Sequence, residues 1–314
     1  MAAVDSFALL YKDIARSCNY YYEMLALVGA LYTAKKVVIL LRSCCSFFRV
    51  HFLPRIFPTK NLKQRFGEWA IVYDAASPVA LAYAEELARH GVSIIFITAD
   101  PDAVRDTVAS LPQAFGVETA VILADFSLDL PALKAIQEVI RHKDIGFLVN
   151  CVEEALTFPQ NLIEVNEENL MQAVKNNPAV MTLLTRSVLP QMLQRSRGAV
   201  VNISTGASSK PLPGRVLLTS SMGFLDQFSY ALHLEYKSKG IFVQSLLPFQ
   251  IASIKENLRE DWLIPKPQVY AHHAISTLGV SHRTTGYWPH TLQYELIRSI
   301  PDLMWVFASR LFIS

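Results

Sequence analysis

Cysteine is scarce in this chain, and the few cysteines form no motif. The 314 residues include only Cys18, Cys44, Cys45 and Cys151. Because these show neither a CxxC pair nor a Cys/His spacing that suits zinc, we expect reduced thiols, no disulfide framework and no metal site.

Charge is scarce as well. Charged residues make up 18% of the chain, against about 25% in an average soluble domain. Hydrophobic residues make up 52%, and such a composition excludes a disordered chain. The net charge is only +2, so no strong positive field attracts nucleic acid, and we expect no nucleic-acid partner.

The chain also lacks a long uncharged apolar run. The longest candidate, residues 24–34, ends after 11 residues at Lys35 and Lys36, whereas a transmembrane helix needs about 18. Acidic residues interrupt the segment before it, at Asp5, Asp13 and Glu23. The sequence therefore predicts neither an ordinary transmembrane helix nor a secretory signal.

Residues 1–66 nevertheless differ from the rest of the chain in charge. Between residues 24 and 67 there is no acidic residue, but there are eight basic ones: Lys35, Lys36, Arg42, Arg49, Arg55, Lys60, Lys63 and Arg65. Lys35, Arg42 and Arg49 are seven residues apart, so they lie near one stripe of a helix. A basic, apolar, acid-free helix suits a membrane surface or an organelle-targeting signal. The alternative is a helix that docks on the protein's own core.

From residue 67 to residue 291, short apolar strands alternate with amphipathic helices. The expected strands cover residues 69–73, 92–98, 119–124, 145–150, 199–204 and 241–247, and the expected helices include 79–90, one from 101, 131–142 and 224–239. This alternation is typical of an α/β domain with a doubly wound parallel sheet, the Rossmann-like architecture. Right-handed crossovers then bring the carboxyl ends of the strands to one edge, where a ligand would sit.

Residues 292–314 form an apolar tail. Its large apolar residues include Leu303, Met304, Trp305, Val306, Phe307, Leu311 and Phe312. We expect a helical tail that extends the core, meets a partner or contacts a membrane.

The first strand-to-helix turn, residues 73–80, contains no glycine. A dinucleotide site needs glycines there, because they permit the tight turn and let the pyrophosphate approach backbone N–H groups at the helix N-terminus. Here Asp74 adds a carboxylate and Ala80 adds a Cβ, while Ser77 and Pro78 suit the N-cap and the first helical position. We interpret this as a turn that caps its own helix and holds no ligand.

The end of the second strand also lacks the residues that select a dinucleotide. A basic residue there would pair with a 2′-phosphate, and an acid would accept from a 2′-hydroxyl. Ala99 does neither, and Asp100, which precedes Pro101, is expected to cap the next helix.

Several longer segments carry a family resemblance. They are residues 82–88 (AYAEELA), 238–246 (SKGIFVQSL), 269–274 (VYAHHA) and 283–288 (RTTGYW). With the order of elements, they resemble the short-chain dehydrogenase/reductases, in the branch of the 17β-hydroxysteroid dehydrogenases and 3-ketoacyl-CoA reductases. Within that branch the chain resembles the inactive hydroxysteroid dehydrogenase-like proteins. The resemblance covers nearly the whole chain, including its N-terminal segment.

The resemblance implies NADP(H) at the sheet edge and a catalytic Asn, Ser, Tyr and Lys. The Asn falls on Asn177 and the Ser on Thr205, so a hydroxyl remains. The Tyr position, thirteen residues after that Ser, falls on Leu218, and the Lys position falls on Met222. Leu and Met supply no proton, charge or strong hydrogen bond. The general acid and the group that lowers its pKa are therefore both lost.

The same resemblance assigns the remains of the cofactor site. The family's glycine turn falls on Asp74, Ser77 and Ala80, without its glycines. Asp125 corresponds to the acid that contacts adenine in the family, and Asn150 to the first Asn of an NNAG segment. We expect no bound cofactor, because the glycine turn is lost.

The sequence therefore predicts a catalytically inactive protein that acts through binding or interaction. The alternatives are a steroid- or acyl-binding protein, with residues 248–267 over its pocket, and a residual NADP(H)-dependent oxidoreductase on a ketosteroid or 3-ketoacyl substrate. A protein partner of unknown identity and a membrane surface are the expected partners. Fold analogy allows a homodimer through the last long helices. The basic helix and the resemblance both point to mitochondria, with the endoplasmic reticulum membrane as the alternative.

Overall fold

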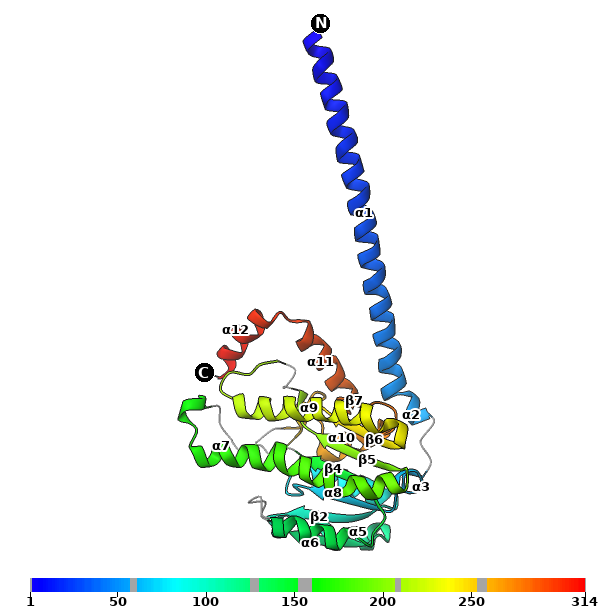
Figure 1. Cartoon of the computed structure of the whole chain (residues 1–314), viewed down its shortest axis with the longest axis vertical. Coiled ribbons are helices and arrows are strands. Elements are labelled where there is room, and N and C mark those ends of the chain that lie inside the picture. The colour runs from blue at the N-terminus through cyan, green and yellow to red at the C-terminus, as the bar shows by residue number, and fades with distance from the viewer. Residues whose placement is uncertain are drawn as a thin grey trace. The chain divides into compact units, whose positions relative to one another are not determined.

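The structure is a computed structural model of the whole chain, and it describes residues 2–56, 61–124, 130–151, 160–206, 210–252 and 259–313. The chain divides into two compact units, Met1–Arg49 and Val50–Ser314. The first unit is a single helix, and the second is an α/β domain (Figure 1). Each unit is described separately below.

The first unit consists of α1 (Ala2–His51), which is 50 residues long. The helical stretch Leu9–Ile56 is long and apolar enough to cross a membrane, by length and composition. The expected apolar run of 11 residues is shorter than this stretch, because it ends at Lys35 and Lys36, whereas the helix continues through them into residues 37–41. A lone helix has no second element over which to bury these apolar side chains.

The second unit is built on one seven-stranded sheet with the order β3-β2-β1-β4-β5-β6-β7. The strands are β1 (Trp69–Tyr73), β2 (Ser93–Thr98), β3 (Thr119–Leu123), β4 (Ile145–Cys151), β5 (Gly198–Ile203), β6 (Ile241–Leu246) and β7 (Arg283–Thr284). All neighbouring strands are parallel. The predicted doubly wound parallel sheet is thus confirmed, and each predicted strand lies within one residue of its expected ends. Only β7 was not predicted, because two residues are too few to show an alternating pattern.

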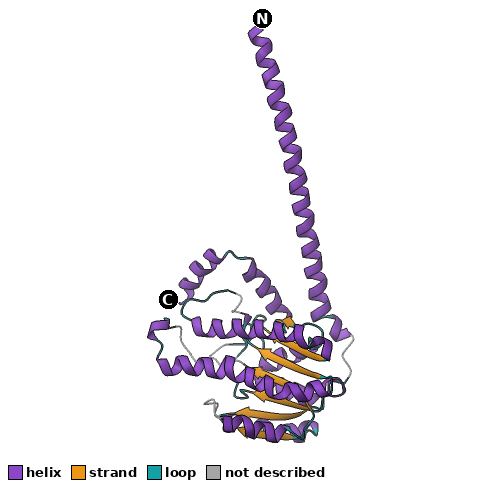
Figure 2. Cartoon of the chain, in the orientation of Figure 1, coloured by secondary structure: helices purple, strands orange, loops and turns teal. Residues whose placement is uncertain are grey.

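Helices cover both faces of the sheet (Figure 2). One face carries α4 (Pro78–Arg89), α5 (Arg105–Phe115) and α10 (Pro267–Ser276), and the other carries α6 (Leu130–Ile140), α8 (Val180–Gln194) and α9 (Val216–Tyr236). Along β1, Ala70 and Val72 join the first core, while Ile71 and Tyr73 join the second. Side chains of a strand alternate between the faces in this way, so both faces of the sheet are buried.

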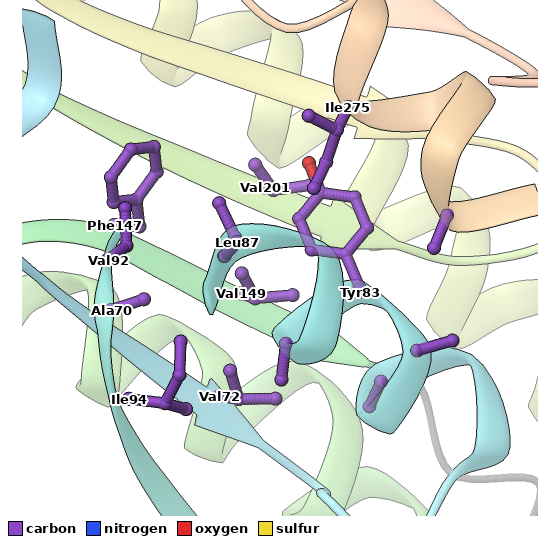
Figure 3. Packing of buried hydrophobic residues seen from close by; sticks show 14 of the residues in the cluster. Ala70, Val72, Tyr83, Leu87, Val92, Ile94, Phe147, Val149, Val201 and Ile275 are labelled. Atoms are coloured by element: carbon purple, nitrogen blue, oxygen red, sulfur yellow. The ribbon is translucent and has the colours of Figure 1, made fainter. Parts of the chain in front are cut away.

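The core under α4 and α10 is shown in Figure 3. Tyr83 and Leu87 come from α4 and Ile275 from α10, and they meet Val149 of β4 and Val201 of β5. Small residues of α4 allow this helix to lie close to the sheet, since four of its alanines are buried: Ala80, Ala82, Ala84 and Ala88.

Residues 50–66 belong with the second unit rather than with α1. They include α2 (Leu53–Ile56) and α3 (Leu62–Phe66). Leu62 and Phe66 are buried, and the Phe66 ring packs edge-on against Phe147 of β4 with the ring centroids 5.4 Å apart. These apolar contacts explain why the domain begins before residue 67.

The remaining helices are α7 (Glu167–Val174), a π-helical turn (Lys175–Ala179), α11 (Trp288–Ser299) and α12 (Asp302–Ile313). Helix α9 begins at Val216, earlier than the expected residue 224, because apolar side chains of its first turns are partly buried. In the tail, Leu303, Met304 and Phe307 are exposed. These three side chains therefore do not extend the core.

Two buried hydroxyls on the first face offer a test of this packing. The Oη atoms of Tyr83 and Tyr270 find no hydrogen-bond partner in the described part of the chain, and burial raises the pKa of both phenols. An unpaired buried polar group costs about 1–3 kcal/mol. We therefore expect Tyr83→Phe to leave the free energy of unfolding unchanged or raise it by about 1 kcal/mol.

Denaturant unfolding of the full chain would measure this change. The control is Leu87→Ala in the same helix, which should lower the free energy of unfolding by about 2–5 kcal/mol because it leaves a cavity. A clear loss of stability in Tyr83→Phe would show that the hydroxyl is hydrogen-bonded after all.

Candidate functional site

The candidate site lies at the carboxyl edge of the sheet. Asp74 follows β1, Asn150 lies at the end of β4, and Thr205 follows β5. Tyr73 pairs in register with Asn150, and Asn150 pairs with Asn202. The structure therefore brings these three sequence-predicted positions to one edge, which is where α/β sheets bind ligands.

The turn from β1 to α4 keeps the backbone path that a glycine normally takes. Asp74 has φ of 55°, in the left-handed region, which Asp tolerates better than most residues because its short polar side chain can bond locally. The Asp74 carbonyl accepts from the Ser77 amide at 3.2 Å. The tight turn thus survives the loss of its first glycine.

Ser77 and Pro78 occupy the start of α4 as predicted, but only one of them acts as expected. Pro78 is at the first helical position, where its missing N–H costs nothing. Ser77 is the N-cap residue, yet its side chain makes no capping hydrogen bond. Its Oγ instead lies 3.5 Å from the Cys151 Sγ. The prediction of side-chain capping is therefore wrong, because the hydroxyl faces the end of β4.

We tested whether this turn fits the dinucleotide that the resemblance implies. A pyrophosphate needs a short, uncharged turn and free backbone N–H groups at the helix start. Asp74 adds a negative charge within the turn, and Pro78 removes one N–H donor. Ala80 is fully buried and carries a Cβ where the family has glycine. These residues do not fit NADP(H).

The end of β2 supplies no nucleotide-binding group either. The Asp100 carboxylate accepts from the amides of Asp102 at 3.0 Å and Ala103 at 3.3 Å. It therefore caps the helical turn that follows, in agreement with the prediction. Asp125, the expected adenine contact, lies outside the described residues.

The positions that the resemblance assigns to the catalytic Ser, Tyr and Lys lie just after β5 and on α9. Thr205 donates its hydroxyl hydrogen to the Pro248 carbonyl at 3.0 Å. Leu218 is partly buried near the start of α9, and Met222, one turn later, is buried. Neither side chain can donate a proton or carry a charge. Of these three positions, Thr205 alone carries a hydroxyl, and that hydroxyl is bonded to the backbone.

Asn177 lies in the π-helical turn Lys175–Ala179 and is buried. The turn includes Pro178, which cannot continue regular α-helical hydrogen bonding. Tyr73, at the end of β1, donates its hydroxyl to the Asn176 carbonyl at 3.0 Å. The irregular turn is therefore fastened to the same edge of the sheet as the other relic positions.

A chain of buried side-chain hydrogen bonds, which the sequence did not reveal, runs beneath the site. Asn150 Nδ2 donates to Asn202 Oδ1 at 2.7 Å, and Asn202 Nδ2 donates to Ser229 Oγ at 2.7 Å. Ser229 in turn donates to the Leu225 carbonyl of α9 at 2.6 Å. These bonds fix α9 to β4 and β5. A polar Asn202 within an otherwise apolar strand was the available signal.

The segment expected to cover a substrate pocket, residues 248–267, is described except for 253–258. His290 Nδ1 accepts from the Phe249 amide at 3.2 Å, and its Nε2 bonds to the Leu263 carbonyl at 3.1 Å. Tyr287 donates its hydroxyl to the Trp262 carbonyl at 3.3 Å. The described ends of the segment are therefore fastened to the start of α11.

The first residues of the second unit are fastened to the same helices. His51 Nε2 lies 2.8 Å from the Thr291 hydroxyl, and the Arg55 guanidinium bonds to His273 Nδ1. Burial, followed by the nearby Arg55 charge, lowers the pKa of both His51 and His273 to about 4. At neutral pH both imidazoles are uncharged, and these contacts are intact.

A groove of about 340 Å³ lies between α4 and α10. Its lining includes Glu85, Glu86, Arg89 and His272. The Glu86 carboxylate is already bonded to His272 at 2.9 Å and to Arg89 at 3.1 Å. The groove belongs to the outer surface of these helices, not to the carboxyl edge of the sheet. In the described part of the chain no group of acidic, His and Cys residues suits a metal ion.

Known proteins of similar sequence place this chain in a family. The short chain dehydrogenase family matches residues 68–261. The inactive hydroxysteroid dehydrogenase-like protein 1 of Danio rerio is 50% identical and covers 99% of both chains. Its Homo sapiens counterpart is 44% identical, covering 99% of this chain and 96% of its own. The very-long-chain 3-oxoacyl-CoA reductase of Homo sapiens is 34% identical over 77% of each chain.

Solved structures share the fold at lower identity. One from a study of 7β-hydroxysteroid dehydrogenase stereoselectivity has a TM-score of 0.68 at 20% identity, covering 79% of this chain and 99% of its own. A short-chain dehydrogenase from Sphingobium yanoikuyae in complex with NADPH has a TM-score of 0.59 at 24% identity, covering 66% and 82%. These likenesses confirm the α/β sheet architecture.

The contacts of His290 predict an acid-sensitive step in stability. Burial lowers the pKa of His290 to about 4, against about 6.5 in the unfolded chain. The unfolded state therefore binds more protons between these values, so stability falls as the pH drops from about 6.5 towards 4. At pH 5 the loss from this residue is about 2 kcal/mol relative to pH 7.

Unfolding of the full chain at pH 7 and pH 5 would measure this loss. We expect His290→Gln, which keeps a donor and an acceptor, to reduce the difference between the two pH values by about 2 kcal/mol. The matched control is His142→Gln at an exposed position, which should leave the difference unchanged. An equal pH dependence in the His290→Gln variant and the parent chain would refute the assignment.

Proposed function

Because the chain belongs to the short-chain dehydrogenase family, we propose that it is a catalytically inactive member, which acts through binding rather than hydride transfer. Two relatives that match almost its whole length are named inactive hydroxysteroid dehydrogenase-like protein 1. The chain has the fold of an oxidoreductase without the groups that the reaction requires.

The observation that carries this proposal is the pair Leu218 and Met222 on α9. Reduction of a ketone needs a proton donor at the carbonyl oxygen, and general acid catalysis typically supplies about 10²- to 10⁴-fold. In the family a Tyr gives that proton and a Lys lowers its pKa. Here both positions are apolar, and the Met222 side chain is packed in the core.

The first turn supports the same conclusion independently. A hydride donor has to sit at the carboxyl edge, held by its pyrophosphate. Asp74 opposes that placement by its negative charge, Pro78 by its missing N–H donor, and Ala80 by the bulk of its Cβ. Restoring an acid on α9 would therefore not restore the reaction by itself.

A steroid- or acyl-binding protein remains the second candidate. Its support is that the described ends of segment 248–267 stay fastened by His290 and Tyr287. A segment that no longer covered anything would not need these buried bonds. Displaceable binding of a labelled steroid to the full chain would favour this candidate over a purely protein-binding role.

For the location, we propose that α1 attaches the protein to an intracellular membrane. The mitochondrion is the favoured location, and the endoplasmic reticulum is the alternative. The helix is long and apolar enough to cross a bilayer. Basic residues without acidic ones follow its apolar centre, as in segments that contact anionic lipid surfaces. The acids before residue 24 argue for an internal or uncleaved signal.

Titration of the full chain with NADPH and NADH by calorimetry tests inactivity at the cofactor level. We expect no heat and no thermal stabilisation up to about 1 mM cofactor, because 1 mM corresponds to only about 4 kcal/mol of binding free energy. The matched variant Asp74→Gly/Pro78→Gly/Ala80→Gly removes the charge and the Cβ and returns the N–H donor, so it should bind more tightly. Micromolar binding by the parent chain would contradict the proposal and favour a residual oxidoreductase.

Exchange of Lys35, Lys36, Arg42 and Arg49 for Gln tests the role of the basic stripe. We expect the fluorescently tagged variant to leave its membrane, because the electrostatic attraction of about 1 kcal/mol per basic residue is removed. A control with the same loss of charge exchanges four exposed basic residues of the folded domain: Lys134, Arg141, Arg186 and Lys239. Unchanged location of the first variant would rule out the stripe as a targeting element.

A further inference from the structure

The start of α12 is fastened to the domain. Lys210 donates to the Ile300 carbonyl at 2.9 Å and pairs with the Asp302 carboxylate. The Trp305 indole N–H donates to the Pro211 carbonyl at 3.0 Å. Both contacts hold the first turn of the helix against residues 210–211.

The outer face of α12 is apolar and uncovered. Leu303 is 88% exposed, Met304 64% and Phe307 73%. At 100° per residue these positions fall within about 100° of the helix circumference, so they form one face. Leu296 of α11 is 68% exposed as well. A soluble domain rarely leaves such large side chains together in water unless something covers them.

We propose that this face of α12 (Leu303, Met304 and Phe307) lies on a lipid surface, so that the domain contacts the membrane at a second place besides α1. The inference rests on the membrane attachment proposed above. A chain whose first unit suits a bilayer keeps its domain within reach of that bilayer. The bilayer is thus an apolar surface within reach of this face of α12.

The other side of α12 is held on the domain. Trp305 is partly buried with its N–H bonded to the Pro211 carbonyl, and the Lys210 ammonium is bonded to the Ile300 carbonyl and paired with Asp302. These contacts leave the apolar face turned away from the domain. A short helix with one apolar face lies in the plane of a lipid interface and does not cross it.

The test uses the full chain with Cys18, Cys44 and Cys45 replaced by Ser, which leaves only the buried Cys151. A single cysteine at Phe307→Cys carries an environment-sensitive fluorophore. The labelled protein is reconstituted in phosphatidylcholine–phosphatidylglycerol vesicles, with or without bromine on the acyl chains. We expect blue-shifted emission and at least twofold quenching by the brominated lipid. Replacing Leu303 and Met304 by Ser in the same labelled chain should reduce the quenching.

Two further label positions separate the outcomes. Leu123→Cys on β3 and Val38→Cys on α1 replace residues that are each 64% exposed. We expect the label at position 38 to be quenched and that at 123 to be unaffected. If the label at position 38 is quenched while the label at position 307 is as unaffected as that at position 123, the second contact does not exist although α1 is in the membrane. If the label at position 38 is not quenched, the membrane attachment itself fails.

A second copy of the chain is the competing occupant of this face. In that case the label at 307 would be shielded without quenching by brominated lipid. Its shielding would also decline when the labelled protein is diluted into excess vesicles. That result would overturn the proposal and assign the face to a protein interface.

Discussion

The turn between β1 and α4 is the constraint on which the rest of the domain depends. It has to lead the central strand directly into a helix that packs on the same sheet, and one residue of the turn must take a left-handed conformation. Asp74 accepts that conformation at modest cost, and Pro78 sets the first helical φ. The backbone geometry of the turn is therefore maintained by residues whose charge and bulk oppose a pyrophosphate. Folding and dinucleotide binding place separable demands on this turn, and its residues suit the first.

The same separation holds across the sheet. The cores on its two faces contain the large apolar residues of every central strand, and they lie below the carboxyl edge. The hydrogen bonds that start from Asn150 at that edge run through Asn202 to Ser229 and fix α9. Neither Leu218 nor Met222 takes part in these bonds. A buried methionine in place of a lysine even avoids the cost of burying an ammonium. Loss of the chemistry thus costs the fold little.

The sequence predicted the sheet because period-two burial and helical spacing are local properties. It also assigns the family's catalytic Tyr and Lys to Leu218 and Met222 by spacing along the chain, and this assignment stays a prediction. It did not predict the hydrogen bond from Cys151 to Ser77, the bonds from His290 to both ends of its segment, or the contact of Arg55 with His273. Each of these joins residues far apart in the sequence, and nothing in the local pattern names the partner. The length of the apolar helix α1 was missed for a different reason. Two lysines interrupt the apolar stretch of the sequence, but the helix continues through them.

Three histidines hold separate parts of the second unit together. His51 bonds to Thr291 of α11, and Arg55 bonds to His273 of α10. Helix α11 in turn holds the described ends of segment 248–267 through His290. Each imidazole is uncharged at neutral pH, because burial lowers its pKa to about 4. The three imidazoles therefore need no counter-ion at neutral pH, and the bonds that they make depend on their staying neutral. The first residues of the second unit and the segment after β6 are thus held on the same two helices by groups that acid would charge together.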